Sequence, residues 1–150
     1  MGRRGELWVA AQGVLLLLFA LAPRIGSPWP AHDIFRLVGW VLAGIGSLLL
    51  VWSALNLGHS LTPLPRPLPD GELVTSGAYG FVRHPIYCAV IIGTLGLSLA
   101  TENWLRLALT GVFFVFFDMK ASQEERWLQE QYPAYMAYKS HVKKLIPWIY

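Results

Sequence analysis

Hydrophobic residues gather in four long segments along the chain, separated by shorter polar stretches. The segments cover residues 7–22, 34–57, 85–100 and 104–118. A helix rises about 1.5 Å per residue and the hydrocarbon layer of a membrane is about 30 Å thick, so the second segment is long enough to cross it. The pattern predicts an all-α integral membrane protein with about four transmembrane helices, forming a single domain over residues 1–150.

The third and fourth segments are separated only by Thr101–Asn103, which predicts an antiparallel pair of helices. Pro85 suits the first turn of the third helix, where its missing N–H costs little. Both segments are short for the roughly 20 residues that a span needs. We therefore expect the fourth helix to continue past Asp118 to about Gln131 and to rise above the membrane.

Two shorter patterns predict how the helices pack. Small residues in the second segment predict close approach of another helix; they are Gly39, Gly44, Gly46 and Ser47. Between Pro133 and Pro147, apolar and aromatic residues recur at helical spacing, namely Tyr135, Tyr138, Val142, Leu145 and Ile146. This second pattern predicts a C-terminal amphipathic helix at the cytoplasmic surface of the membrane.

Charged residues are few and unevenly distributed. They make up 14% of the chain, against 55% hydrophobic residues, whereas a soluble domain carries roughly 25% charged residues. Of the 12 Lys and Arg residues, only Arg24, Arg36 and Arg106 fall on one side of the predicted membrane, which leaves 12 − 3 = 9 for the other side. By the positive-inside rule, both termini and the central loop, residues 59–84, are expected in the cytoplasm. We expect the membrane to be a bacterial inner membrane.

The composition also argues against several classes of partner. No Lys/Arg-rich run indicates nucleic-acid binding. Cys88 is the only cysteine, so the chain can form no intrachain disulfide, and no Cys/His spacing typical of a zinc site is present. The sequence does not determine the oligomeric state.

Polar residues suited to ligand binding gather in two places on the predicted cytoplasmic side. The first is the end of the central loop, where Tyr79, Arg83, His84 and Tyr87 flank the start of the third helix. A helix N-terminus attracts anions, and tyrosine rings attract cationic groups and stack on purines. The second is the exposed end of the fourth helix, where the carboxylates of Glu124–Glu125 suit an ammonium group or ribose hydroxyls.

Together the two places complement a zwitterionic amino acid attached to a nucleoside. S-adenosylmethionine has this outline, and other zwitterions fit the same charges. Each residue also has a structural explanation: Arg83 as an interfacial anchor, His84 as a helix cap, and Glu124–Glu125 as a solvated helix face. The rival class is a non-enzymatic four-helix membrane protein such as a small transporter, but the interiors of the first three segments lack the ionisable residue that a transporter uses.

Three blocks of sequence resemble the isoprenylcysteine carboxyl methyltransferase family, which is related to the phospholipid N-methyltransferases. The blocks are LVTSGAY at 73–79 with RHPIY at 83–87, EERWL at 124–128, and Tyr135-x-x-Tyr138 followed by Ile146-Pro147. The resemblance extends over roughly residues 56–147, more than half of the chain.

The resemblance implies an integral membrane methyltransferase that uses S-adenosylmethionine and releases S-adenosylhomocysteine, with a cofactor-binding part over residues 71–147. The residues implied to bind the cofactor are Gly71, Glu72, Leu73, Val74, Tyr79, His84, Pro85, Ile86, Tyr87 and Glu124. It also implies that the C-terminal part folds over the cofactor. A lipid-like acceptor is then expected to enter laterally from the bilayer.

Three residues are predicted to act on the acceptor. Arg83 and Lys120 are expected to orient an anionic acceptor, and the eukaryotic members of the resembled family place an Arg near the position of Lys120. A carboxylate acceptor is already a nucleophile at neutral pH. An amine, as in the alternative of a phospholipid N-methyltransferase, must first lose a proton to a base such as Glu125 or Asp118. The sequence leaves methylation at oxygen, nitrogen or sulfur open.

Overall fold

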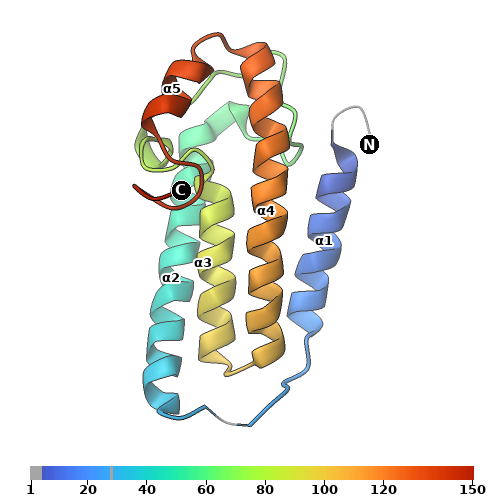
Figure 1. Ribbon diagram of the computed structural model, residues 1–150, viewed down its shortest axis with the longest axis vertical. Coiled ribbons are helices and arrows are strands. Elements are labelled where there is room, and N and C mark those ends of the chain that lie inside the picture. Colours follow the sequence, from blue (N-terminus) through green and yellow to red (C-terminus); the bar gives the residue numbers. More distant parts are fainter. Residues whose placement is uncertain (1–4, 28) are drawn as a thin grey trace.

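The computed structural model describes residues 5–27 and 29–150 and consists of helices joined by loops (Figure 1). The described residues contain no strand, only an isolated bridge between Val82 and Lys143. The α-helices are α1 (Glu6–Leu21), α2 (His32–Leu57), α3 (Pro85–Ala100), α4 (Trp104–Gln131) and α5 (Tyr135–His141), and the 3₁₀ turns are η1 (Gly58–Ser60) and η2 (Gly77–Gly80). The predicted all-α class is confirmed. Arg3 and Arg4, which contribute to the predicted cytoplasmic charge, lie outside the described residues.

Four long helices lie side by side, and the central loop, α5 and the C-terminal segment gather over one end of them (Figure 1). Among the described residues, one region, His32–Ser60 with a mean hydropathy of 2.1, is long and apolar enough to cross a membrane. The helices Glu6–Leu21 and Pro85–Ala100 are also apolar but shorter. The predicted extension of the fourth helix matches α4, which ends at Gln131.

Helices α2 and α3 pack closely because glycines face each other across their contact. A Cβ added to Gly46 would lie 2.6 Å from the backbone nitrogen of Gly93 and 2.8 Å from the carbonyl oxygen of Ala89. Gly39 meets the backbone of Gly96 in the same way. The prediction for Gly44 was wrong: no atom lies within 4 Å of a Cβ added there, because Gly44 faces outward.

The turn between α3 and α4 is fixed by the side chain of Asn103, which is 1% exposed. Its Oδ1 accepts hydrogen bonds from the backbone N–H groups of Leu105 at 3.0 Å and Arg106 at 3.3 Å, so it caps the N-terminus of α4. Its Nδ2 donates to the carbonyl oxygen of Pro23 at 3.1 Å. One buried amide therefore closes the predicted helical pair and ties the end of α1 to it.

The C-terminal segment differs from the amphipathic helix that the sequence predicts. Helix α5 ends at His141, and the following residues run alongside the start of α3, where the N–H groups of Arg83 and His84 donate to the carbonyl oxygens of Lys143 at 2.8 Å and Lys144 at 3.2 Å. Backbone pairing with the loop replaces further helical bonds. Tyr135 and Leu145 are consequently buried in the protein instead of lying along a membrane surface.

The glycine contact between α2 and α3 generates a matched test. We expect Gly46→Ala to lower the melting temperature in detergent, because overpacking a tight helix contact costs about 1–3 kcal/mol. Gly44→Ala should leave the melting temperature unchanged or raise it, because this substitution adds the same methyl group in open space and improves helix propensity. Thermal unfolding followed by circular dichroism checks both, and equal melting temperatures for the two variants would contradict the packing described above.

Candidate active site

A cavity of about 390 Å³ lies at the covered end of the helices. It is bounded by α1, the end of α2, the central loop, the start of α3, the upper part of α4 and the C-terminal helix α5. Of the residues that the sequence analysis selects, those lining it are Glu72, Leu73, Val74, Tyr79, Arg83, His84, Ile86, Tyr87, Lys120 and Glu124. Gly71, Pro85 and Glu125 do not line it. Most of the selected residues therefore meet in one space.

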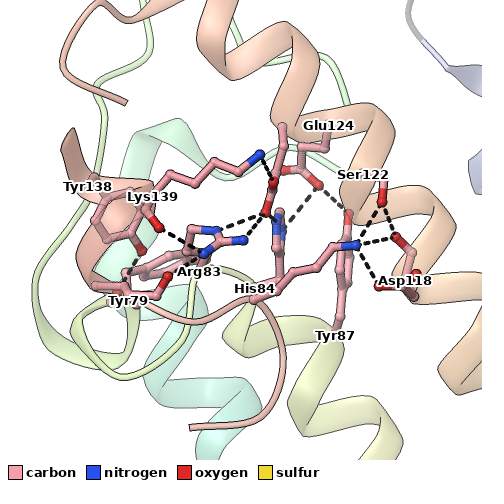
Figure 2. Close-up of polar contacts among 12 residues, drawn as sticks. Tyr79, Arg83, His84, Tyr87, Asp118, Ser122, Glu124, Tyr138 and Lys139 are labelled. Atoms are coloured by element: carbon pink, nitrogen blue, oxygen red, sulfur yellow. Dashed lines mark hydrogen bonds and ion pairs between the residues drawn. The ribbon is translucent and has the colours of Figure 1, made fainter. Parts of the chain in front are cut away.

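The start of α3 and the exposed end of α4 converge at Glu124 (Figure 2). The hydroxyl of Tyr87 donates a hydrogen bond to Glu124 Oε2 at 2.5 Å, and His84 Nδ1 lies 3.8 Å from the same oxygen. His84 immediately precedes α3 and Tyr87 lies in its first turn, so their contacts with Glu124 close the cavity between the two helices. The structure brings the two polar regions of the sequence together.

Glu125, the neighbour of Glu124, has a different environment. Arg83 Nε and Nη2 each lie 2.8 Å from its Oε1, Lys139 Nζ lies 2.8 Å from its Oε2, and His84 Nε2 lies 3.3 Å from Oε1 (Figure 2). Burial alone would raise the pKa of this carboxyl group, but the hydrogen bonds from His84 and Lys139 and the charge of Arg83 hold it far below its usual range. Glu125 is therefore ionised and fully paired, which makes it a poor base.

The guanidinium of Arg83 is used entirely within the protein. Besides the two bonds to Glu125, its Nη1 donates to the carbonyl oxygens of Val142 and, at 3.3 Å, Lys139. All three of its nitrogens thus have protein partners, so orienting an acceptor, as the sequence analysis expects of Arg83, would require breaking one of these bonds. The geometry instead favours a role in holding α4 and α5 against the start of α3.

Lys120 is buried, at 2% exposure, on the cavity wall. Its ammonium group donates to Gln12 Oε1 at 2.6 Å and lies 5.1 Å from the centre of the Tyr87 ring. Burial lowers the pKa of Lys120, and the charge of Glu124 opposes this effect. No carboxylate among the described residues lies within the 4.0 Å of an ion pair with Lys120. A buried cation without a bound carboxylate is suited to an anionic ligand group.

An aromatic column connects the cavity to the helix core. The rings of His84 and Tyr87 are stacked 5.4 Å apart, Tyr87 stacks on Phe117 at 4.7 Å, and Phe117 stacks on Phe113 at 5.8 Å. Phe113 and Phe117 are fully buried, and Phe19 of α1 meets Phe113 edge-on. The position of the cavity floor is therefore set by packing among the helices.

Several site residues were missed by the sequence analysis because their roles depend on distant partners. Gln12 binds Lys120, and the hydroxyl groups of Tyr132 and Tyr138 donate to the carbonyl oxygens of Gly71 at 2.8 Å and Tyr79 at 2.6 Å. The helical spacing of Tyr135 and Tyr138 predicts that they pack against the protein, but spacing alone does not indicate that they line a cavity.

Asp118, the alternative base of the sequence analysis, lies outside the cavity. Its Oδ1 accepts from Lys144 Nζ at 2.5 Å and from the Tyr150 hydroxyl at 3.0 Å. Lys144 also donates to the Ser122 hydroxyl at 2.7 Å (Figure 2). These contacts attach the C-terminal segment to α4, so Asp118 acts in folding this region.

Comparison with known proteins identifies the family of the chain. A model of the phospholipid methyltransferase family matches residues 34–135, which is more than half of the chain. The chain belongs to this family. Relatives named as protein-S-isoprenylcysteine O-methyltransferases are also similar to the chain, so the resemblance noted in the sequence is confirmed.

Three similar proteins illustrate the range of the family. The cobalt-zinc-cadmium resistance protein CzcN of Cupriavidus metallidurans is 30% identical to this chain, over 97% of this chain and 63% of its own length. A probable protein-S-isoprenylcysteine O-methyltransferase of Oryza sativa subsp. indica is 28% identical over 99% of this chain and 84% of its own. Methanethiol S-methyltransferase 1 of Bradyrhizobium diazoefficiens is 27% identical over 93% of this chain and 52% of its own. The chain thus spans between about half and five sixths of the length of these relatives.

The ion cluster around Glu125 predicts a stability that depends on pH. Glu125→Gln should lower the melting temperature at pH 7, because breaking one partner of a buried ion pair costs about 3–5 kcal/mol. The pKa of Glu125 is lower in the folded than in the unfolded state, so its contribution is fully present above the unfolded value of about 4.3 and declines progressively as the pH falls from there toward the lower folded value. The difference from the unsubstituted protein should therefore shrink at acidic pH. Unfolding in detergent from pH 7 to pH 3 tests this, with exposed Glu130→Gln as the control, and a difference that is constant across the range would contradict it.

Proposed function

We propose that this protein transfers the methyl group of S-adenosylmethionine to a lipophilic, anionic acceptor. The observation that carries the proposal is the convergence of His84, Tyr87 and Glu124 on a cavity that also contains the buried cation Lys120. Membership of the phospholipid methyltransferase family, with relatives named as methyltransferases, supports the same chemistry.

The cavity fits the methyl donor in size and in charge. Its volume of about 390 Å³ lies within the roughly 300–1,000 Å³ of small-molecule sites. Glu124 would hold the ammonium group of the amino-acid end, and the N-terminus of α3 would attract its carboxylate. Tyr79 lines the cavity and would offer its ring to the cationic sulfur or the purine. When bound, S-adenosylmethionine supplies an electrophilic methyl group on its sulfonium.

The cavity also suits the acceptor. Val9, Leu61 and Leu128 line it together with Lys120 and Gln12, so an apolar chain would meet aliphatic side chains while an anionic group meets the ammonium. Gln12 keeps the Lys120 side chain in place through its amide oxygen. Such an arrangement orients the acceptor and excludes water, which are the two contributions that methyl transfer requires of the protein.

The state of the nearby carboxylates favours an acceptor that needs no deprotonation. Glu125 and Asp118 are both ion-paired, and Glu124 accepts a hydrogen bond from Tyr87. An oxygen or sulfur anion is already a nucleophile, whereas a protonated amine needs a base. These contacts therefore support an anionic acceptor over the ethanolamine lipid of a phospholipid N-methyltransferase.

The proposed arrangement in the membrane has four spans, with the cavity and both termini on the cytoplasmic side. Large apolar side chains on the outer faces of the helices are more than half exposed, as expected for contact with lipid; examples are Leu17, Leu18, Leu48, Leu55 and Val115. The distribution of Lys and Arg supports the orientation. An acceptor dissolved in the bilayer would then reach the cavity laterally, between helices.

Glu124 provides the test of cofactor binding. Glu124→Gln keeps an oxygen for the Tyr87 hydroxyl but removes the charge, so we expect the affinity for S-adenosylhomocysteine to fall about 10-fold or more. Titration calorimetry of the detergent-solubilised protein measures this, and the melting temperature shows whether the fold is kept. Glu130→Gln on the exposed part of the same helix should bind normally. Unchanged affinity in Glu124→Gln would refute the role of Glu124.

Lys120 provides the test of the acceptor. With labelled S-adenosylmethionine, Lys120→Met should lower kcat/KM for a prenylated cysteine carboxylate about 100-fold, as loss of one fixed charge in a dry site can do. Its affinity for S-adenosylhomocysteine should change little. Lys143→Met, at an exposed lysine outside the cavity, is the control. Preferential methylation of ethanolamine lipids, unaffected by Lys120→Met, would overturn the anionic acceptor.

A further inference from the structure

The hydroxyl of Tyr135 is buried beside the cavity and has no hydrogen-bond partner among the described residues. Tyr135 is the first residue of α5, and it is 1% exposed. A buried polar group that lacks a partner is energetically costly, and folded proteins pair nearly all such groups. Tyr135 also lines the cavity, so its side chain lies beside the space in which a ligand would bind.

The surroundings of Tyr135 separate it from other buried polar groups. The indole N–H groups of Trp8 and Trp29 also lack partners among the described residues, but neither side chain lines the cavity. The cavity tyrosines Tyr132 and Tyr138 donate their hydroxyls to backbone carbonyl oxygens. Tyr135 therefore combines two properties, an unpaired hydroxyl and a position in the cavity wall.

We propose that the Tyr135 hydroxyl is a further cofactor-binding group, which donates a hydrogen bond to the carboxylate at the amino-acid end of the methyl donor. The inference rests on the proposed function. Burial raises the pKa of Tyr135, as does the charge of Glu125, and the opposing charge of Arg83 does not reverse this, so the hydroxyl keeps its proton at neutral pH and is available as a donor. The charge of Glu124, which would hold the ammonium group of the same end, also acts on this hydroxyl.

Tyr135→Phe tests the assignment, because it removes the hydroxyl and leaves the ring. Since that hydroxyl has no partner in the protein, the melting temperature without ligand should stay the same or rise. Calorimetry should show binding of S-adenosylhomocysteine weakened about 10-fold or more, because a hydrogen bond to a charged group is lost. Binding of 5′-methylthioadenosine, which lacks the amino-acid end, should be unchanged.

Tyr138→Phe is the matched control, because its hydroxyl is bonded to the Tyr79 carbonyl oxygen at 2.6 Å. This variant should lose thermal stability, the effect expected of a purely structural tyrosine. A similar loss in Tyr135→Phe, unchanged binding of S-adenosylhomocysteine, or equal weakening of both ligands would overturn the assignment. Unsubstituted protein that binds neither ligand would instead overturn the proposed function itself.

Discussion

The ion pairs of the buried Glu125 carboxylate join three parts of the chain that are far apart in sequence. Arg83 comes from the start of α3, Glu125 from α4 and Lys139 from α5, and all three meet within 2.8 Å contacts. A charge removed from water in this way is stable only when every partner is in place. This cluster holds together three of the parts of the chain that bound the cavity, and it forms only when α5 and the segment after it have folded back.

Adjacent glutamates serve separate purposes because of helix geometry. Successive residues of an α-helix point about 100° apart, so Glu124 and Glu125 face different sides of α4. Glu125 meets Arg83 and is closed to ligands, whereas Glu124 borders the cavity and meets Tyr87. Arg83 and His84 also differ in their contacts. The guanidinium of Arg83 bonds only to protein groups, whereas the imidazole of His84 lies between the two carboxylates. The paired residues of the sequence motif thus combine one structural member with one that reaches the ligand space.

The helices could be predicted from the sequence because they depend on local pattern. The span 85–100 matches α3, and the continuation of the fourth segment past Asp118 matches α4. The course of the C-terminal segment could not be predicted in this way. The pairing of Val82 with Lys143 joins residues about sixty positions apart, and it replaces a helix that the local sequence pattern favours. Contacts between residues distant in sequence were likewise not predictable within the site. Residue types identified Glu124 and His84 as ligand candidates, but the commitment of Arg83 and Glu125 to each other is visible only in three dimensions.

The column of rings that runs from His84 through Tyr87 and Phe117 to Phe113 carries an implication for the evolution of the helix core. Tyr87 rests on Phe117, so a change in the bulk of a residue well below the cavity alters the height at which the Tyr87 hydroxyl meets Glu124. Interiors are close-packed and transmit such strain. Under the proposed function, ligand recognition therefore depends also on phenylalanines that do not line the cavity, and the inner faces of the helices serve recognition as well as folding.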